Sequence, residues 1–429
     1  MKNYLKPILL LPFLLLSGCN FQYVYNISGL VDDGKVDGDI WEDTSGVDDS
    51  GTYDIKIWVD EKIVELTSSQ VQSFVNSYGG KYTINLNIEP MTESNAATSM
   101  LQDVQDGADI FCFAQDQLAR LKVAGAVTKL TGSLSSYIRE KNSDESIQAA
   151  SIGNSLYAFP TTNDNGYFLY YNKEFVSDES SKNMTTLLST LKAAGKKLNF
   201  SARSDGFYTA SYFVGMGCHS NWTINETTGK FSEYDDNYNT DNGLIAAKGI
   251  KEIADSSVVA TRSIWTSDAG AVVSGIWEYS SLLKRWGDNL GCAELPTFTV
   301  DGVEHHLGSF DGYKFIGVKP QVDSKKASVC RKLAQFLTNN ASQTERFNLV
   351  GWGPTNIETS KKSEVLAHPG LSALRAQHEY AAQQGQCPSS WFSTLAAVGT
   401  AIKESTSDSE LKAILETYEA TLPSCLSED

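Results

Sequence analysis

The sequence contains few of the residues and none of the short motifs that mark common catalytic sites. It has five histidines in 429 residues, and none of them belongs to an HExxH zinc motif. P-loop, GxGxxG and GxSxG patterns are also absent, so nothing indicates a phosphate-binding loop, a dinucleotide site or a serine nucleophile. His305-His306 stands beside Gly302 and Gly308, where a solvated turn is expected. We therefore predict no resident metal ion and no cofactor.

Positive charge is the second deficit. The chain has 35 Lys and Arg against 52 Asp and Glu, which gives a net charge of −17 and a pI near 4.8. This balance argues against nucleic acid or an anionic membrane surface as a partner. The hydrophobic content of 41% is ordinary for a globular protein. At this length the chain is expected to divide into two or three domains.

Cysteine is scarce, and no CxxC pair occurs among the seven residues. Apart from Cys19 there are six: Cys112, Cys218, Cys292, Cys330, Cys387 and Cys425. Cys387 and Cys425 flank a predicted helical tail and could form a disulfide. Cys112 lies in an apolar strand-like run, which predicts a buried free thiol.

The N-terminus carries a targeting signal. A short basic start, Met1–Lys6, precedes the apolar run Ile8–Leu16, which is far shorter than the ~20 residues of a membrane-spanning helix. Leu16-Ser17-Gly18-Cys19 follows and resembles a bacterial lipobox. We predict a signal peptide over residues 1–18, a lipid on Cys19, and anchoring to the cell membrane on its extracellular or periplasmic side. The alternative is an ordinary cleaved signal peptide with a cysteine nearby by chance.

Residues 19–51 are predicted to form a flexible acidic tether after the lipid. Asp32 to Asp49 is rich in acidic residues and glycine, a composition typical of disorder. The stretch Asp33–Asp39 is also similar to the start of a calcium loop. Because Lys35 stands where an oxygen ligand is required and Thr44 where a bidentate Glu should be, a solvated linker is favoured over calcium binding.

Strand-like and helix-like patterns then alternate along the chain. Strands are predicted at Tyr53–Val59, Tyr82–Ile88 and Asp109–Ala114, with amphipathic helices between them. This alternation predicts a doubly wound α/β sheet that binds ligands at the carboxyl ends of its strands. Polar residues stand at two such ends, in Asp60–Lys62 and Phe113–Gln117, so we expect a binding site there.

Five segments resemble the family 1 extracellular solute-binding proteins of ABC importers, of the maltodextrin-binding type. They follow the family's order: Asp109–Leu130, Leu156–Pro160 with Tyr170–Lys173, Ala271–Tyr279, Leu349–Thr355 and Pro388–Phe392. The resemblance implies a type II periplasmic-binding-protein-like fold with two α/β lobes joined by a hinge. It implies lobe one over 52–160 with 312–355 and lobe two over 161–311 with 360–429. The implied partners are a carbohydrate and the importer's membrane subunits, and the implied state is a monomer.

The resemblance assigns ten ligand-binding positions. They are Glu61, Lys62, Phe113, Asp116, Asn163, Asp164, Asp205, Tyr208, Trp277 and Trp391. Other readings stay open, because Phe113, Trp277 and Trp391 could be core residues and Asp116 could be a helix N-cap. Gln117 replaces an Arg of the maltodextrin type, and residues 161–166 are one residue longer, so another oligosaccharide matches at least as well as maltodextrin.

The predicted function is reversible capture of a neutral oligosaccharide, without covalent chemistry. The 8 Trp, 19 Tyr and 18 Phe supply faces on which sugar rings can stack. Two alternatives remain at this point. One is a cell-surface glycoside hydrolase, or another carbohydrate-active lipoprotein, built on a pair of carboxylates. The other is the same fold binding a non-sugar solute such as a polyol.

Overall fold

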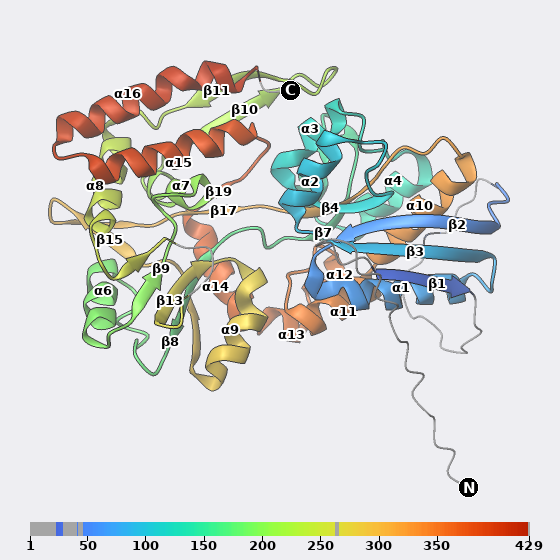
Figure 1. Cartoon of the computed structure of the whole chain (residues 1–429), viewed down its shortest axis with the longest axis horizontal. Helices are drawn as coiled ribbons and strands as arrows, with labels where there is room; N and C mark the ends of the chain where they lie inside the picture. Colours follow the sequence, from blue (N-terminus) through green and yellow to red (C-terminus); the bar gives the residue numbers. More distant parts are fainter. Residues whose placement is uncertain (1–22, 29–40, 42–45, 262–265, 428–429) are drawn as a thin grey trace, which may run out of the picture.

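A computed structural model describes residues 23–28, 41, 46–261 and 266–427, in which two sheets carry separate groups of helices (Figure 1). The predicted signal peptide, the lipidated Cys19 and the candidate calcium stretch Asp33–Asp39 lie outside the described residues. So does part of the predicted tether.

The first sheet has six strands in the order β1-β3-β2-β4-β18-β7. Its strands are β1 (Tyr23–Ser28), β2 (Gly51–Val59), β3 (Tyr82–Pro90), β4 (Ile110–Ala114), β7 (Phe159–Thr162) and β18 (Lys314–Val318). β2 runs parallel to β3 and β4, whereas β18 is antiparallel to β4 and β7. The accompanying helices are α1 (Val64–Ser77), α2 (Glu93–Gln102), α3 (Leu118–Val123), α4 (Gly132–Lys141), α5 (Asp144–Ala149), α10 (Ser324–Leu337), α11 (Asn340–Val350) and α12 (Ile357–Ser360).

The second sheet has five strands in the order β12-β9-β13-β8-β14. They are β8 (Phe168–Asn172), β9 (Lys197–Asn199), β12 (Val259–Ala260), β13 (Ala269–Ser274) and β14 (Leu290–Ala293). The accompanying helices are α6 (Met184–Ala193), α7 (Gly206–Gly215), α8 (Asp241–Ala254), α9 (Tyr279–Trp286), α14 (Pro369–Gln377), α15 (Ser389–Glu404) and α16 (Asp408–Cys425). α15 packs on α7, α8 and α16.

Short two-stranded sheets and one further α-helix accompany the two main sheets. They are β5 (Ser151–Ile152) with β6 (Ser155–Leu156), β10 (Ser220–Ile224) with β11 (Phe231–Asp236), β15 (Thr297–Val300) with β16 (Val303–His306), β17 (Ser309–Asp311) with β19 (Ala381–Gln383), and α13 (Ser363–Leu366).

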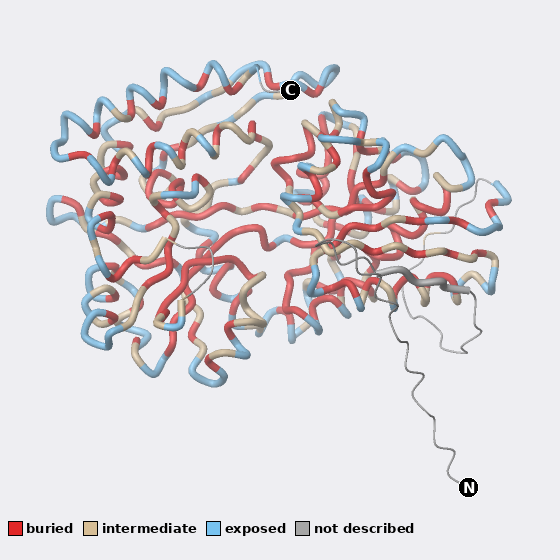
Figure 2. Tube along the Cα trace, viewed as in Figure 1, coloured by how far each residue is buried: buried red, intermediate tan, exposed pale blue. Residues whose placement is uncertain are grey.

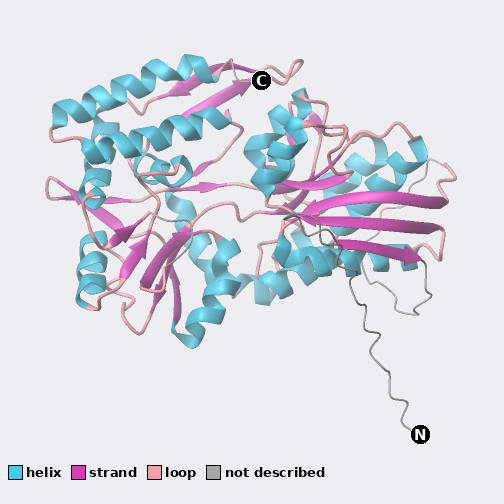
Figure 3. Cartoon of the chain, in the orientation of Figure 1, coloured by secondary structure: helices cyan, strands magenta, loops and turns pink. Residues whose placement is uncertain are grey.

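Residue patterns explain why these strands form. β3 alternates buried and half-buried side chains, as a strand covered mainly on one face should. Every residue of β8 is buried, which fits a strand inside a sheet covered on both faces. Figure 2 shows buried segments running through both halves of the molecule, and Figure 3 shows helices beside both sheets. The predicted α/β class is confirmed.

The chain passes between the two halves three times, after β7, before β18 and after α12. α12 packs on α11, and the amide N of Asn356 donates to Gln343 Oε1 at 3.0 Å. The lobe bounds given above remain predictions. We propose one adjustment, that lobe one continues through α12 to about Ser360.

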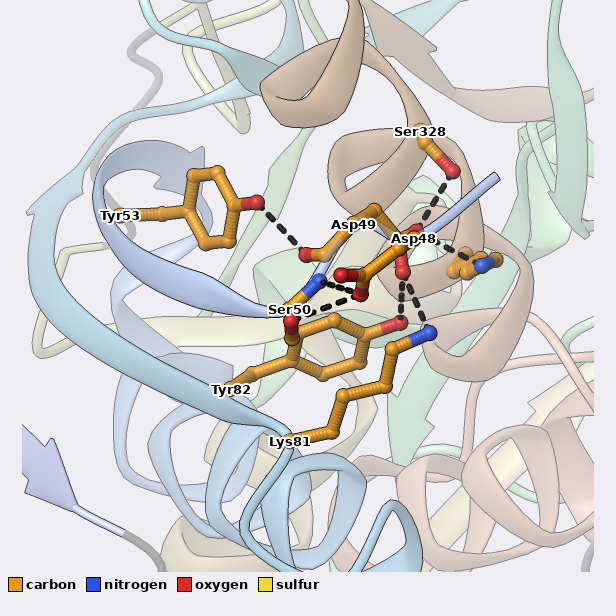
Figure 4. A network of polar contacts seen from close by, with 8 residues as sticks. Asp48, Asp49, Ser50, Tyr53, Lys81, Tyr82 and Ser328 are labelled. Carbon is orange, nitrogen blue, oxygen red and sulfur yellow. Dashed lines mark hydrogen bonds and ion pairs between the residues drawn. The ribbon is translucent and has the colours of Figure 1, made fainter. Parts of the chain in front are cut away.

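Described parts of the predicted tether are built into the folded body. β1 pairs with β3 along its whole length. Asp49 is fully buried, and its carboxylate accepts hydrogen bonds from Lys332 Nζ at 2.7 Å and Tyr82 Oη at 3.0 Å (Figure 4). Lys81 Nζ lies 2.5 Å away. Burial acts to raise the pKa of Asp49, but these donors outweigh it and hold the pKa well below its usual range.

The possible disulfide between Cys387 and Cys425 is not formed, because Cys425 is a free thiol. Its Sγ faces the carbonyl oxygen of Thr421 at 3.9 Å, one helical turn back. Cys112 is also a free thiol, as predicted, but it is only partly buried.

Replacing Asp49 with Asn is expected to lower the free energy of unfolding by about 3–5 kcal/mol, because the buried Lys332 ammonium loses the negative charge that balances it. The stability of the variant should also fall less steeply with decreasing pH than that of the parent. A carboxyl whose folded pKa is depressed contributes stability above its unfolded pKa of about 3.9, and that contribution is lost as the pH falls further.

Urea titrations at several pH values between 3 and 7 would measure both effects. Asp48→Asn is the matched control, since Asp48 is exposed and its carboxylate accepts hydrogen bonds from the neighbouring Ser50 at 3.1 Å and 2.7 Å. Equal stability of the Asp49 and Asp48 variants at pH 7 would contradict the anchoring role of Asp49.

Candidate functional site

The candidate site lies where the two halves face each other. Short 3₁₀ helices follow β2 and β4, at Glu61–Ile63 and Gln115–Gln117. Because β2 and β4 are parallel, both turns lie at the same carboxyl edge of the first sheet. The second half contributes Ile276–Glu278, directly after β13, together with β19 and the start of α15.

Trp277 joins the two halves. Lys62 Nζ donates to the Trp277 carbonyl oxygen at 2.7 Å, and Lys314 Nζ lies 4.9 Å from the centroid of the indole ring. A Cβ at Gly275 would come within 2.0 Å of that ring, so only glycine leaves room for it. The indole is half-buried. It therefore retains surface that a ligand could contact.

Asp116 forms a second link between the halves. It is buried, and its Oδ1 accepts a hydrogen bond from Gln384 Nε2 at 3.0 Å. Gln384 Oε1 in turn accepts from Asn165 Nδ2 at 2.7 Å. Burial raises the pKa of the Asp116 carboxyl. The alternative that Asp116 caps a helix is wrong, because α3 begins after Gln117 without a side-chain cap.

Arg120 is a site residue that the sequence reading missed. Its guanidinium donates to Gln117 Oε1, and Nη1 donates to Ser389 Oγ at 2.9 Å in the other half. Arg120 stands one helical turn after Gln117. The i,i+3 spacing was the signal that could have found it.

Tyr208 and Asp205 lie at the start of α7. The half-buried Tyr208 ring packs on Tyr167 at 5.0 Å between centroids and on Phe207 at 5.4 Å. Asp205 accepts from the Phe207 amide N at 3.1 Å and is the N-cap of α7. The half-buried Phe392 lies 6.2 Å from Phe207 and adds an aromatic ring that the sequence reading passed over.

Asp164 lies in the first crossing between the halves. Its Oδ2 accepts from the Gly353 amide N at 2.6 Å, and the Asn163 amide N donates to the Gly353 carbonyl oxygen at 3.0 Å. Asp164 is buried, whereas Asn163 is exposed. These bonds fasten the first crossing segment to the loop between α11 and α12, which is a structural role for Asp164. Glu61 is exposed in the turn that also carries Lys62.

Phe113 and Trp391 lie in the cores. Phe113 has no exposed surface and packs between Phe111 and Phe315, both at 5.6 Å, because its side chain points into the layer beside β4. Trp391 is 2% exposed, and its Nε1 donates to Tyr418 Oη at 2.9 Å on α16. Both match the core alternative, and neither is part of the site proposed below.

A buried ion pair lies beside Trp277. Lys314 Nζ is 3.1 Å from Glu93 Oε1 and 5.2 Å from the centroid of the Trp352 ring. Burial acts to lower the pKa of Lys314, but the carboxylates of Glu93, Asp164 and Asp60 together outweigh it and raise the pKa overall, so the ammonium stays charged. The sequence reading missed Lys314 because a lysine at the start of a strand shows no pattern of its own.

Within residues 23–28, 41, 46–261 and 266–427, no helix has the length and apolar character needed to cross a membrane. In the same ranges, no three His, Cys, Asp or Glu side chains gather in a way that could hold a metal ion.

Comparison with known families decides the identity. Residues 71–373 match the family described as bacterial extracellular solute-binding protein. The chain belongs to this family. No curated protein matches this solute-binding protein in sequence.

Solved structures confirm the predicted two-lobed, periplasmic-binding-protein-like fold. The unliganded maltodextrin-binding protein MalE1 from L. casei BL23 superposes with a TM-score of 0.72 at 20% identity, covering 88% of this chain and 100% of its own. The GacH receptor of Streptomyces glaucescens superposes with a TM-score of 0.70 at 15% identity, covering 89% of this chain and 100% of its own. The MalE domain from Bdellovibrio bacteriovorus, bound to maltotriose, superposes with a TM-score of 0.70 at 16% identity, covering 86% of this chain and 100% of its own.

The two predicted ligand-binding tryptophans should respond differently to replacement by Ala. Trp277→Ala is expected to weaken ligand binding by about 1–3 kcal/mol, the magnitude of a lost stacking contact. Trp391→Ala is expected to lower the free energy of unfolding by about 3–5 kcal/mol, because it opens a cavity in the core.

Both variants would be titrated calorimetrically with a saccharide that the parent protein binds, and both would be unfolded in urea. The two measurements check the two expected effects. The assignment fails if Trp391→Ala weakens binding while leaving stability unchanged, or if Trp277→Ala binds like the parent.

Proposed function

We propose that this solute-binding protein captures a carbohydrate in the cleft between its lobes and delivers it to an ABC importer. The main observation is the half-buried indole of Trp277, held at the junction of the lobes by Lys62 and Lys314. Relatives support the ligand class, since the structures matched above are of a maltodextrin-binding protein, a receptor studied with acarbose and a domain bound to maltotriose.

The residues at the junction of the lobes suit sugar hydroxyls. Asp116 offers a carboxylate acceptor, which forms stronger hydrogen bonds than a neutral acceptor. Gln117 and Gln384 bond to it and bring amide groups that can donate or accept. The aromatic rings of Trp277 and Tyr208 supply apolar faces. This mixture of rings, amides and one carboxylate favours a neutral polyhydroxylated ligand.

Charge argues against an anionic ligand. Lys314 is balanced by Glu93 at 3.1 Å, and Asp116 would repel a phosphate or carboxylate group. We therefore propose a neutral saccharide, and an oligosaccharide rather than a polyol because Trp277 and Tyr208 supply two half-buried aromatic faces.

Ligand binding is proposed to stabilise contacts between the lobes. Arg120 Nη1 donates to Ser389 Oγ at 2.9 Å, and Lys122 Nζ donates to the Thr227 carbonyl oxygen at 2.9 Å in the turn between β10 and β11. A ligand that touches both lobes shifts the hinge equilibrium toward the form with these contacts. The importer's membrane subunits would recognise that form of a monomeric receptor.

Thermal-shift screening tests the proposal. Mono- and oligosaccharides should include at least one ligand that raises the melting temperature, because binding to the native state adds stability. Amino acids, peptides and divalent metal ions form the comparison panel. Stabilisation by members of that panel alone would overturn the carbohydrate proposal. Turnover of labelled oligosaccharides would show that the protein is a hydrolase and not a receptor.

The lipid anchor on Cys19 is a further proposal, which rests on Leu16-Ser17-Gly18-Cys19. Produced with its own leader in a bacterium that acylates lipoproteins, the parent should enter the detergent phase of a Triton X-114 separation. Cys19→Ser should move to the aqueous phase, because acyl chains contribute about 0.8 kcal/mol per buried CH₂. Equal partitioning of the two proteins would rule out this anchor.

A further inference from the structure

A small cavity lies in lobe one next to the ion pair of Lys314 and Glu93. It measures about 30 Å³, and its lining includes the apolar residues Ile63, Ile316 and Leu337. Asp60, Glu93, Thr162, Lys314 and Arg346 supply its polar lining. One water needs roughly 10–15 Å³ on this scale, so the cavity has room for about two heavy atoms.

Arg346 gives the cavity an unused hydrogen-bond donor. The side chain is 5% exposed, and Nη2 donates to the Leu337 carbonyl oxygen at 2.8 Å. Among the described residues, Nη1 has no hydrogen-bond partner. Burial lowers the pKa of Arg346 to about 10, which still leaves the guanidinium charged near neutral pH. An unpaired donor on a buried charged group is costly, so a ligand oxygen placed against it would be favoured.

The cavity also adjoins the cleft. Lys314, which lines it, lies 4.9 Å from the centroid of the Trp277 ring on the opposite lobe. Trp352 lines the cavity and lies 5.2 Å from the same ammonium. A saccharide ring placed on Trp277 would therefore have this cavity beside it.

We infer that the cavity is a subsite for the hydroxymethyl group of a hexose unit. The carbon atom would contact the apolar lining, and the hydroxyl oxygen would accept from Arg346 Nη1. The carboxylates of Asp60 and Glu93 could accept the hydroxyl hydrogen, because both line the same space. This inference rests on the proposed carbohydrate function and adds a specificity, for hexose units over pentose units.

Filling the cavity tests the inference. Cys112 lines it from β4, and Cys112→Leu adds about two heavy atoms beyond the sulfur. Saccharides of hexoses that bind the parent should bind this variant at least tenfold more weakly. Pentose saccharides, wherever they bind the parent, should bind the variant equally well. Calorimetry with glucose and xylose, galactose and L-arabinose, and cellotriose and xylotriose provides matched pairs, with maltotriose as an additional hexose probe.

Two further variants keep the test decisive. Cys292→Leu is the matched control, a partly buried cysteine on β14 of the other sheet, and should bind like the parent. Arg346→Lys keeps the charge, removes the Nη1 donor and should weaken hexose binding. This variant takes the place of Cys112→Leu if that variant does not fold.

The possible outcomes separate the two proposals. Hexose binding that is unchanged in Cys112→Leu, or in Arg346→Lys where that variant is used, would show that the cavity holds water only and would overturn the subsite alone. If no saccharide binds the parent, the carbohydrate function itself fails.

Discussion

The contact of Trp277 with two lysines of the opposite lobe is the constraint on which the binding account depends. Lys62 holds the backbone of Trp277 from a turn after β2, and Lys314 faces its ring from β18. Lys62 and Lys314 are 252 residues apart in the sequence. Their segments meet because β18 returns to the first sheet. The position of the indole thus depends on the topology as much as on the sequence around it.

Buried charge organises lobe one at two distant places. Asp49 balances Lys332 and ties the start of the folded body to α10. Lys314 pairs with Glu93 at the carboxyl edge of the sheet, beside the cleft. In both cases a buried charge is retained beside a partner of opposite sign, since desolvation without a partner would be prohibitive. The first pair anchors the fold, and the second leaves a cation at the place where we propose that ligand binds.

Sequence reasoning predicted those features that are local. Alternation identified β3, the apolar run identified β4, and motif order identified the family. It could not tell Trp277 from Trp391, because both are tryptophans on matched motifs. Only the packing distinguishes the two tryptophans, since Trp391 on α15 is buried and donates a hydrogen bond to Tyr418 on α16. Arg346 and Lys314 gave no local signal, because their importance comes from burial and from partners far away in the chain.

The most direct test is a crystal structure of the protein with the saccharide that stabilises it best. The account predicts a sugar ring against the Trp277 indole, with a hydroxyl group within hydrogen-bond reach of Asp116. A saccharide bound away from Trp277, or seated only on the outer surface of one lobe, would contradict it.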